Sequence, residues 1–333
     1  MKNELIHQIQ NLEPNLKPEE IFSVILPEIT KINLFEVIEN YQFLKFHTFL
    51  YELGKIPHGI GLGVAFMAQV NISGRILKLG SEKGHSLSSS LLKDVLNGKT
   101  SVSLGVSESG WKGRLSNIKS ELKKEDDKFY LSGSKGFLTN GLNSGYYIII
   151  ARYEDSFVPV LVSSDSGDIQ KTPFSMDFAK EATHCRLEFN NLPISKENIL
   201  PLNYSEYGES MRFSELLSLS YIGLGYLEFL LHKYQGSYDN FEGFEFQKKL
   251  DWFLNFLHSV SQKKERDVNV DLEDDFPYGL EILVKEWKSL IRNLDFNEFL
   301  GENPDFKMFQ FGEETTKIYY LKKLRNLRAK NES

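Results

Sequence analysis

The stretch SKGFLTNG, residues 134–141, decides how the middle of the chain is interpreted. It combines the aromatic Phe137, the hydroxyl of Thr139 and an Asn140-Gly141 pair, and it precedes the apolar run YYIIIARY at residues 146–153. A compact apolar run of this length is typical of a buried strand, and Asn-Gly favours a tight turn. From these residues alone, the stretch is either a turn between strands or a site that holds a flat, polar ligand.

Length, charge and cysteine content limit the classes of protein. A chain of 333 residues is long enough for two or three packed units. Its net charge of −7 gives the chain as a whole no nucleic-acid-binding footprint. The single Cys185 excludes an intrachain disulfide and a thiolate metal site, and the seven histidines lack metal-ligand spacing. We therefore predict neither a nucleic-acid partner nor a metal.

The first twenty residues are mixed and polar. They have neither the apolar core of a signal peptide nor an apolar run of membrane-spanning length. We therefore expect a cytoplasmic protein without a membrane span.

Helical periodicity dominates residues 1–99, the first predicted domain. A helix is expected to begin at Pro18, and residues 34–53 form one long apolar pattern that predicts a second helix. Residues 59–80 are apolar almost all round, which predicts a buried helix whose glycines allow close packing. Gly98 is expected to end the last helix of this domain.

Short alternating runs mark residues 100–203, the second predicted domain, as a β-sandwich or barrel. In residues 184–192 the alternation places Cys185, Leu187 and Phe189 on one face and leaves His184, Arg186 and Glu188 on the other. Residues 204–333 return to helical spacing and form the third predicted domain, a helical bundle. Its expected helices cover residues 214–234, 246–264, 277–294 and 315–330, and an acidic loop is expected at residues 265–276.

Several short motifs in fixed order resemble the acyl-CoA dehydrogenase family. They are LLKDVLNGK, SLGVSESGWKGR, GFLTNG, YYIIIAR, HCRLEFNNLPISKENIL and SYIGLGYLEFLL, and the resemblance extends from about residue 88 to about residue 230. The spacing from Glu108 to the LSGSK segment at residues 131–135 fits the family pattern without a gap. The resemblance implies an α+β architecture of an N-terminal helical domain, a central β domain and a C-terminal helical bundle.

The resemblance also implies a chemistry, the α,β-dehydrogenation of an acyl-CoA thioester with FAD as hydride acceptor. It assigns the polar edge of the flavin to Leu104, Val106 and Ser107. It places Phe137 beside the flavin ring and Thr139 near its reactive nitrogen. Without the neighbouring motifs, Phe137 and Thr139 would be ordinary strand residues beside a turn.

The catalytic base of many family members lies in a C-terminal motif that FGEETTKI, residues 311–318, resembles in part. The match assigns the base to Glu313, a cofactor contact to Thr315, and the substrate side to Gly312 and Glu314. The alternative is a solvated helix N-terminus, where acidic residues are favoured. In other members the base lies on the first long C-terminal helix, where this chain has Phe213.

Other positions depart from the family pattern. Gly113 and Arg114 replace the Ser and Asp linked to CoA contact, and Tyr238 replaces an Arg that meets the FAD pyrophosphate. Phe241 is the candidate for the adenine side. Residues 293–306 hold one glycine where the family has a glycine-rich segment, although close backbone approach to a pyrophosphate needs glycines.

Three hypotheses follow. The first is an active FAD-dependent acyl-CoA dehydrogenase of fatty acid metabolism, with electron-transfer flavoprotein or a similar acceptor as partner. The family's quaternary structure implies a homo-oligomer, dimer or tetramer, or a hetero-oligomer with a related subunit. The second is a catalytically degenerate homologue that serves as a partner subunit or binds acyl-CoA or flavin. The third is a flavin-dependent oxidase or monooxygenase on the same fold.

Overall fold

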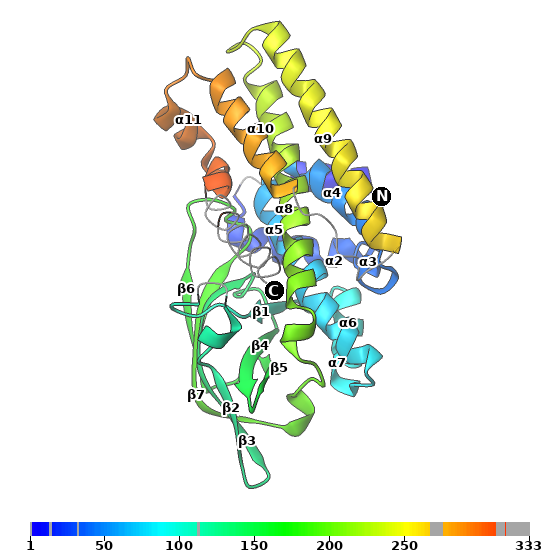
Figure 1. Ribbon diagram of the computed structural model, residues 1–333, viewed down its shortest axis with the longest axis vertical. Helices are drawn as coiled ribbons and strands as arrows, with labels where there is room; N and C mark the ends of the chain where they lie inside the picture. Colours follow the sequence, from blue (N-terminus) through cyan, green and yellow to red (C-terminus); the bar gives the residue numbers. More distant parts are fainter. Residues whose placement is uncertain are drawn as a thin grey trace, which may run out of the picture.

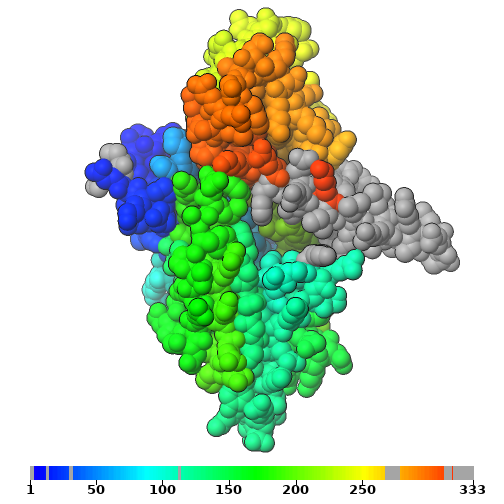
Figure 2. Space-filling view, turned by 90° about the vertical axis from the view of Figure 1, so that its left-hand side faces the viewer, coloured from blue at the N-terminus to red at the C-terminus, as the bar shows by residue number. Residues whose placement is uncertain are grey.

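The computed structural model describes residues 2–12, 15–31, 33–111, 114–266, 276–310 and 317. Helices from both ends of the chain pack together, and a β domain lies against them at one end (Figure 1). In the space-filling view the β domain, cyan to green, forms the lower part, and the helices drawn in yellow and orange form the upper part (Figure 2).

The N-terminal part is helical, as predicted. Its elements are α1 (Lys2–Gln10), α2 (Pro18–Lys31), α3 (Glu36–Asn40), α4 (Phe43–Gly54), α5 (Gly59–Met67), the π-helix η1 (Ala68–Gly74), α6 (Arg75–Glu82) and α7 (Ser86–Leu96). Helix α2 begins at Pro18, as expected for proline in the first turn. After α7, Gly98 adopts φ +62°, which confirms the predicted glycine at the helix end.

The prediction of one helix over residues 34–53 is wrong, because the helix is broken after Asn40. Tyr41 adopts the left-handed conformation with φ +51°, and α4 begins two residues later. The break changes the direction of the chain, so that Val37 and Ile38 of α3 and Phe46 of α4 are all buried. No glycine or proline marks this position, so the pattern of residues alone gave no signal for it.

The buried helix predicted at residues 59–80 is confirmed. The stretch Gly59–Glu82 is long and apolar enough to cross a membrane, but 89% of its most apolar window is buried, as in the core helix of a soluble protein. Its middle widens into the π-helix η1, a geometry often found at functional sites. Gly63 lies where a Cβ atom would be 3.0 Å from the Ile222 side chain, so the glycine permits close packing against α8.

The middle part is a seven-stranded mixed sheet. Its strands are β1 (Val102–Gly105), β2 (Glu121–Glu125), β3 (Lys128–Thr139), β4 (Tyr146–Tyr153), β5 (Ser156–Ser163), β6 (Ile169–Phe174) and β7 (His184–Ile194). The order is β1-β4-β2-β3-β7-β6, with β5 paired to β4. The parallel pair β1–β4 sets one edge of the sheet, and the antiparallel pair β6–β7 sets the other.

The sheet curls so that β1 and the chain that follows it lie beside the end of β3. Ser103 Oγ donates a hydrogen bond to the Thr139 carbonyl oxygen over 2.7 Å, and Gly136 N donates to the Ser107 carbonyl oxygen over 2.8 Å. These bonds join segments that the strand order separates. They bring Ser107 next to the SKGFLTNG stretch.

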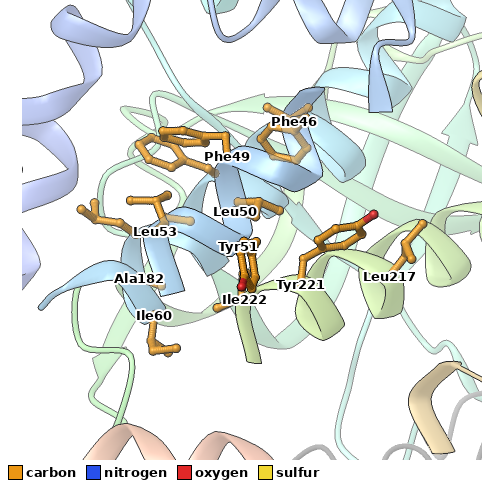
Figure 3. Packing of buried hydrophobic residues seen from close by; sticks show 14 of the residues in the cluster. Phe46, Phe49, Leu50, Tyr51, Leu53, Ile60, Ala182, Leu217, Tyr221 and Ile222 are labelled. Carbon is orange, nitrogen blue, oxygen red and sulfur yellow. The ribbon is translucent and has the colours of Figure 1, made fainter. Parts of the chain in front are cut away.

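The described C-terminal part is helical, as predicted, whereas the helix expected at residues 315–330, except residue 317, and most of the loop expected at residues 265–276 lie outside the described residues. It contains α8 (Gly208–Lys233), α9 (Asn240–Arg266), α10 (Phe276–Leu290) and α11 (Phe296–Glu302). Figure 3 shows α4 crossing α8, with Leu50 and Tyr51 close to Tyr221 and Ile222. Glycine makes this crossing possible, because a Cβ on Gly225 would lie 2.0 Å from the Tyr51 carbonyl oxygen. One hydrophobic cluster therefore joins both helical parts, and the domain boundaries at 99/100 and 203/204 stay a prediction.

Candidate functional site

A bulge in β3 arranges the SKGFLTNG stretch. Lys135 pairs with Leu187 and Leu138 pairs with Cys185, so three steps along β3 match two along β7. Bulges of this kind re-aim side chains. Lys135 and Leu138 are fully buried, whereas Phe137 and Thr139 are half-buried. The bulge therefore presents a ring and a hydroxyl on the less covered side of the strand.

Phe137 is held by two other rings. Its centroid lies 4.6 Å from the His184 ring and 5.5 Å from the Phe174 ring. The alternation in β7 is confirmed for Arg186 and Glu188, which are exposed, but His184 is only 4% exposed because Phe137 and Phe174 cover it. Burial lowers the pKa of His184 to about 4, so its imidazole is neutral at pH 7. The three rings form an uncharged wall.

Two hydroxyl groups lie in the segments that form this wall. The carbonyl oxygens of Ser107 and Thr139 accept the hydrogen bonds that tie β1 to β3. The hydroxyls of Ser107 and Thr139 have no hydrogen-bond partner in the described part of the chain, and both residues are half-buried. A ring beside two half-buried hydroxyls fits a planar ligand with polar atoms along one edge.

A buried ion pair that was not predicted from the sequence involves Lys135, two residues before Phe137. Lys135 Nζ lies 2.6 Å from Glu108 Oε1, with side chains 0% and 4% exposed. Glu108 also accepts hydrogen bonds from the backbone N–H groups of Lys119 and Ser120. Lys135 Nζ reaches the Val106 carbonyl oxygen over 3.3 Å. The pair therefore fixes the segment after β1 against β3.

The electrostatics of the pair follow from its burial. Burial lowers the pKa of Lys135 to about 8 against the opposing charge of Glu108, so the ammonium is charged at pH 7. Burial alone would raise the pKa of Glu108. The hydrogen bond and charge of Lys135, with the hydrogen bonds from Lys119 and Ser120, instead hold it below its usual value. The gap-free spacing from Glu108 to the LSGSK segment gave the only sequence signal for this contact.

The structure brings together five of the predicted flavin-edge residues. Leu104 and Val106 are partly buried against the large core, and they lead to Ser107 beside the β3 bulge that carries Phe137 and Thr139. Phe241 lies apart from them, 66% exposed in the first turn of α9. Five further predicted residues, Gly113, Gly312, Glu313, Glu314 and Thr315, lie outside the described residues.

At the alternative base position the structure places no carboxylate. Phe213 is 9% exposed, and the Lys264 ammonium lies 5.4 Å from its ring centroid. Glu215, two residues on, forms an ion pair with Arg212. A base on α8 is therefore not formed by these residues.

Residues 293–306, which stand where the family has a glycine-rich segment, contribute buried aromatic side chains to the hydrophobic core. Asp295 caps α11 by accepting hydrogen bonds from the backbone N–H groups of Asn297 and Glu298. Phe299 and Phe306 are 2% and 0% exposed, with ring centroids 5.1 Å apart. Tyr238, which replaces the family Arg, donates its hydroxyl proton to the Leu231 carbonyl oxygen. These residues fit aromatic packing and not a backbone cradle for a pyrophosphate.

A flavin is therefore matched in one half only. The ring and the two hydroxyls at the β1–β3 junction fit the polar edge and face of an isoalloxazine. The residues at 293–306 do not fit the dinucleotide half. Among the described residues, no group of three His, Cys, Asp or Glu side chains is placed to hold a metal ion.

Comparison with solved structures identifies the fold. An FAD-dependent dehydrogenase matches with a TM-score of 0.70 at 16% identity, covering 94% of this chain and 92% of that one. A glutaryl-CoA dehydrogenase from Mycobacterium smegmatis, in complex with FADH2, matches with a TM-score of 0.70 at 15% identity, covering 88% and 82%. The prolyl acyl carrier protein oxidase AnaB matches with a TM-score of 0.68 at 15% identity, covering 87% and 84%.

No family model matches the sequence. The structural matches show that the chain has the acyl-CoA dehydrogenase-like fold predicted from its motifs, with a β domain between two helical parts.

Proposed function

We propose that this chain is a flavin-dependent oxidoreductase of the acyl-CoA dehydrogenase type, with FAD as its cofactor and an acyl-CoA thioester as its substrate. The observation that carries the proposal is the β1–β3 junction, where Phe137 supplies a flat wall and Ser107 and Thr139 supply two hydroxyls without partners among the described residues. A bound FAD would accept hydride from the acyl chain. The solved structures of similar fold, which include FAD-dependent dehydrogenases, support the proposal.

Each residue at the junction has a defined part in this proposal. Phe137, held between His184 and Phe174, excludes water from one side of the ring site. The hydroxyls of Ser107 and Thr139 bind and orient the polar edge. Glu108 and Lys135 act behind them as positioning residues, because their ion pair joins the two segments that carry the hydroxyls. Glu313 remains the candidate base on the motif match alone.

Flavin binding tests the proposal directly. Purified protein, supplemented with FAD, is expected to show the visible absorption bands of a bound flavin. Thr139→Val removes one hydrogen bond and should weaken FAD binding roughly 3- to 10-fold. Thr172→Val is the matched control, because Thr172 is exposed on β6. Failure of the wild-type chain to bind FAD would refute an active flavoenzyme.

The base is tested separately from the cofactor. Glu313→Gln should abolish flavin reduction by acyl-CoA while leaving FAD binding unchanged, and Glu298→Gln, at an exposed carboxylate on α11, is the control. Reduction that survives in Glu313→Gln would assign the base elsewhere. The electron acceptor is a separate question. Reoxidation of the reduced flavin by an electron-transfer flavoprotein would support a dehydrogenase, and reoxidation by molecular oxygen would mark an oxidase.

Self-association is proposed to involve α9 and α10. Their exposed large apolar side chains are Phe241, Phe244, Trp252, Tyr278 and Ile282. A shallow, open hollow of about 300 Å³ lies among Phe244, Trp252 and the charged residues Glu245, Lys248 and Lys249. Pairing of this face with a second copy would cover these apolar side chains.

A second candidate function rests on the segment at residues 293–306. Because Phe299 and Phe306 commit this segment to the core, the chain could hold a flavin only in part. In that case it would serve as a non-catalytic subunit paired with a related chain. Wild-type protein that binds FAD only in the presence of such a partner would favour this function.

A further inference from the structure

A row of polar side chains, the polar seam, lies in the core between the η1–α6 segment and α8. It consists of Asn71 and Arg75 on one side and Ser210, Ser214 and Ser218 on the other. Ser210, Ser214 and Ser218 recur at four-residue spacing on α8, so they share one face of the helix. Asn71 Nδ2 donates to Ser218 Oγ over 2.6 Å and lies 3.4 Å from the Ser214 carbonyl oxygen. One turn further along, Arg75 Nη2 donates to Ser210 Oγ over 3.3 Å. The seam therefore ends at Arg75.

Arg75 is buried with few partners in the described part of the chain. Its side chain is 6% exposed, and within those residues its Nε and Nη1 atoms have no hydrogen-bond partner. Glu82 and Tyr41 act on its charge from a distance, but the Glu82 carboxylate is engaged by Tyr41 over 3.3 Å and by Lys78 over 3.5 Å. A guanidinium carries five N–H donors, and burying its charge unpaired is costly. A group of this kind is suited to receive an anion.

A second cation converges on the same hydroxyl. Lys264 of α9 is 3% exposed, and its Nζ lies 3.2 Å from Ser210 Oγ. Ser210 also belongs to the first turn of α8, whose N-cap residue Tyr207 provides no side-chain hydrogen bond. A helix N-terminus favours negative charge. Ser210 is itself only half-buried, so this end of the seam reaches the surface.

We propose that Arg75, Lys264 and Ser210 form a binding site for the carboxylate or phosphate group of a small anionic ligand. Among the described residues the guanidinium keeps two unused N–H directions, the ammonium offers a second positive charge, and the serine hydroxyl lies between them. The site goes beyond the proposed function, because no flavin is needed to form it.

Ligand-induced thermal shifts of the full-length protein test the site. The probes are inorganic phosphate and glutarate, each compared with sodium chloride at equal ionic strength. The wild-type melting temperature should rise with at least one probe. Arg75→Met should lose this rise and, without ligand, should melt at a higher temperature than wild type because an unpaired buried charge is removed. Lys78→Met, on the same helix, should respond as wild type does.

Calorimetric titration separates the possible sources of the anion. Phosphate or glutarate binding that weakens at least about tenfold in Lys264→Gln supports a site for free anions. Glutaryl-CoA that binds more tightly than the uncharged pentanoyl-CoA, with the difference lost in Lys264→Gln, supports an anionic acyl group. The proposal is overturned if wild-type protein binds none of these probes more tightly than chloride. It is also overturned if Arg75→Met folds, melts below wild type and keeps the wild-type response.

Discussion

Removal of one partner of the Glu108–Lys135 pair is expected to show how much the pair contributes to the free energy of unfolding. Lys135→Met keeps a long apolar stem but deletes the ammonium that lies 2.6 Å from Glu108 Oε1. The carboxylate would then be 4% exposed without its counter-ion. Breaking a buried pair in this way costs about 3–5 kcal/mol of the free energy of unfolding. Because backbone N–H groups of Lys119 and Ser120 still bind Glu108, we expect the low end of that range.

The pH dependence of this loss distinguishes it from lost packing. In the wild type the pKa of Glu108 is held below its usual value of 4.5 against the effect of burial, so its contribution is present above pH 4.5 and is lost as the pH falls further. In Lys135→Met only the two backbone donors oppose burial, so Glu108 would take up a proton at a higher pH. The stability difference between wild type and variant should therefore be larger at pH 7.5 than at pH 5.

Urea denaturation at pH 7.5 and pH 5 measures both quantities. Lys123→Met is the control, because Lys123 is 62% exposed, pairs with Glu121 over 3.5 Å and should lose less than about 1 kcal/mol. The double variant Glu108→Gln/Lys135→Met should lose much less than the sum of the single variants. A loss in Lys135→Met that is below about 1 kcal/mol, or that is equal at both pH values, would refute the reasoning.

Three further predictions concern other parts of the molecule. Gly225→Ala places a Cβ 2.0 Å from the Tyr51 carbonyl oxygen and should lower the free energy of unfolding, measured in urea titrations, by about 1–3 kcal/mol or more. Gly236→Ala is the control, because a Cβ there would have no atom within 4 Å and should change the free energy of unfolding little. Burial, with a smaller effect of His258, lowers the pKa of His47 from 6.5 to about 3, so this residue should lower stability by about 1.6 kcal/mol between pH 6.5 and pH 5. His47→Gln should reduce the measured fall by about that amount and leave the part that the buried His184 contributes, so an unchanged slope would contradict the assignment. Trp252→Glu, at a side chain 70% exposed, should leave the melting temperature within about 2 °C of wild type and lower the mass in light scattering; an unchanged oligomeric mass would exclude this face.

The sequence predicted those elements whose signals are local. Gly98 ends its helix and Pro18 begins another because their backbone preferences decide the outcome. The three-part order followed from motifs whose spacing reflects strand pairing, whereas the packing of His184 and Phe174 around Phe137 was not predicted. The break at Tyr41, which was predicted wrongly, and the burial of His184, which was not predicted, both involve contacts with distant segments.

The buried charges were hidden from the sequence for the same reason. From the sequence alone, Lys135 and Arg75 are expected at the surface, because lysine and arginine are almost never fully buried without a partner. The partner of Lys135 comes from 27 residues earlier in the chain, and Arg75 meets a serine 135 residues away. Only the folded arrangement shows that Lys135 forms an ion pair, whereas Arg75 donates to a neutral hydroxyl.

The division of the candidate flavin site into a formed half and an unformed half leads to a last prediction. The β1–β3 junction fits only the ring, and the segment at residues 293–306 is used for packing, so a single chain gains little from the adenosine half of FAD. If the proposed α9–α10 face forms an oligomer that Trp252→Glu dissociates, the monomeric variant should bind FMN within about 10-fold of FAD in fluorescence titrations, a difference of no more than about 1.4 kcal/mol. If a second copy then completes the dinucleotide half, the wild type should prefer FAD more strongly than the variant does. A monomer that prefers FAD by 100-fold would show that this chain recognises the adenosine half unaided, and a purely structural role for residues 293–306 would be wrong.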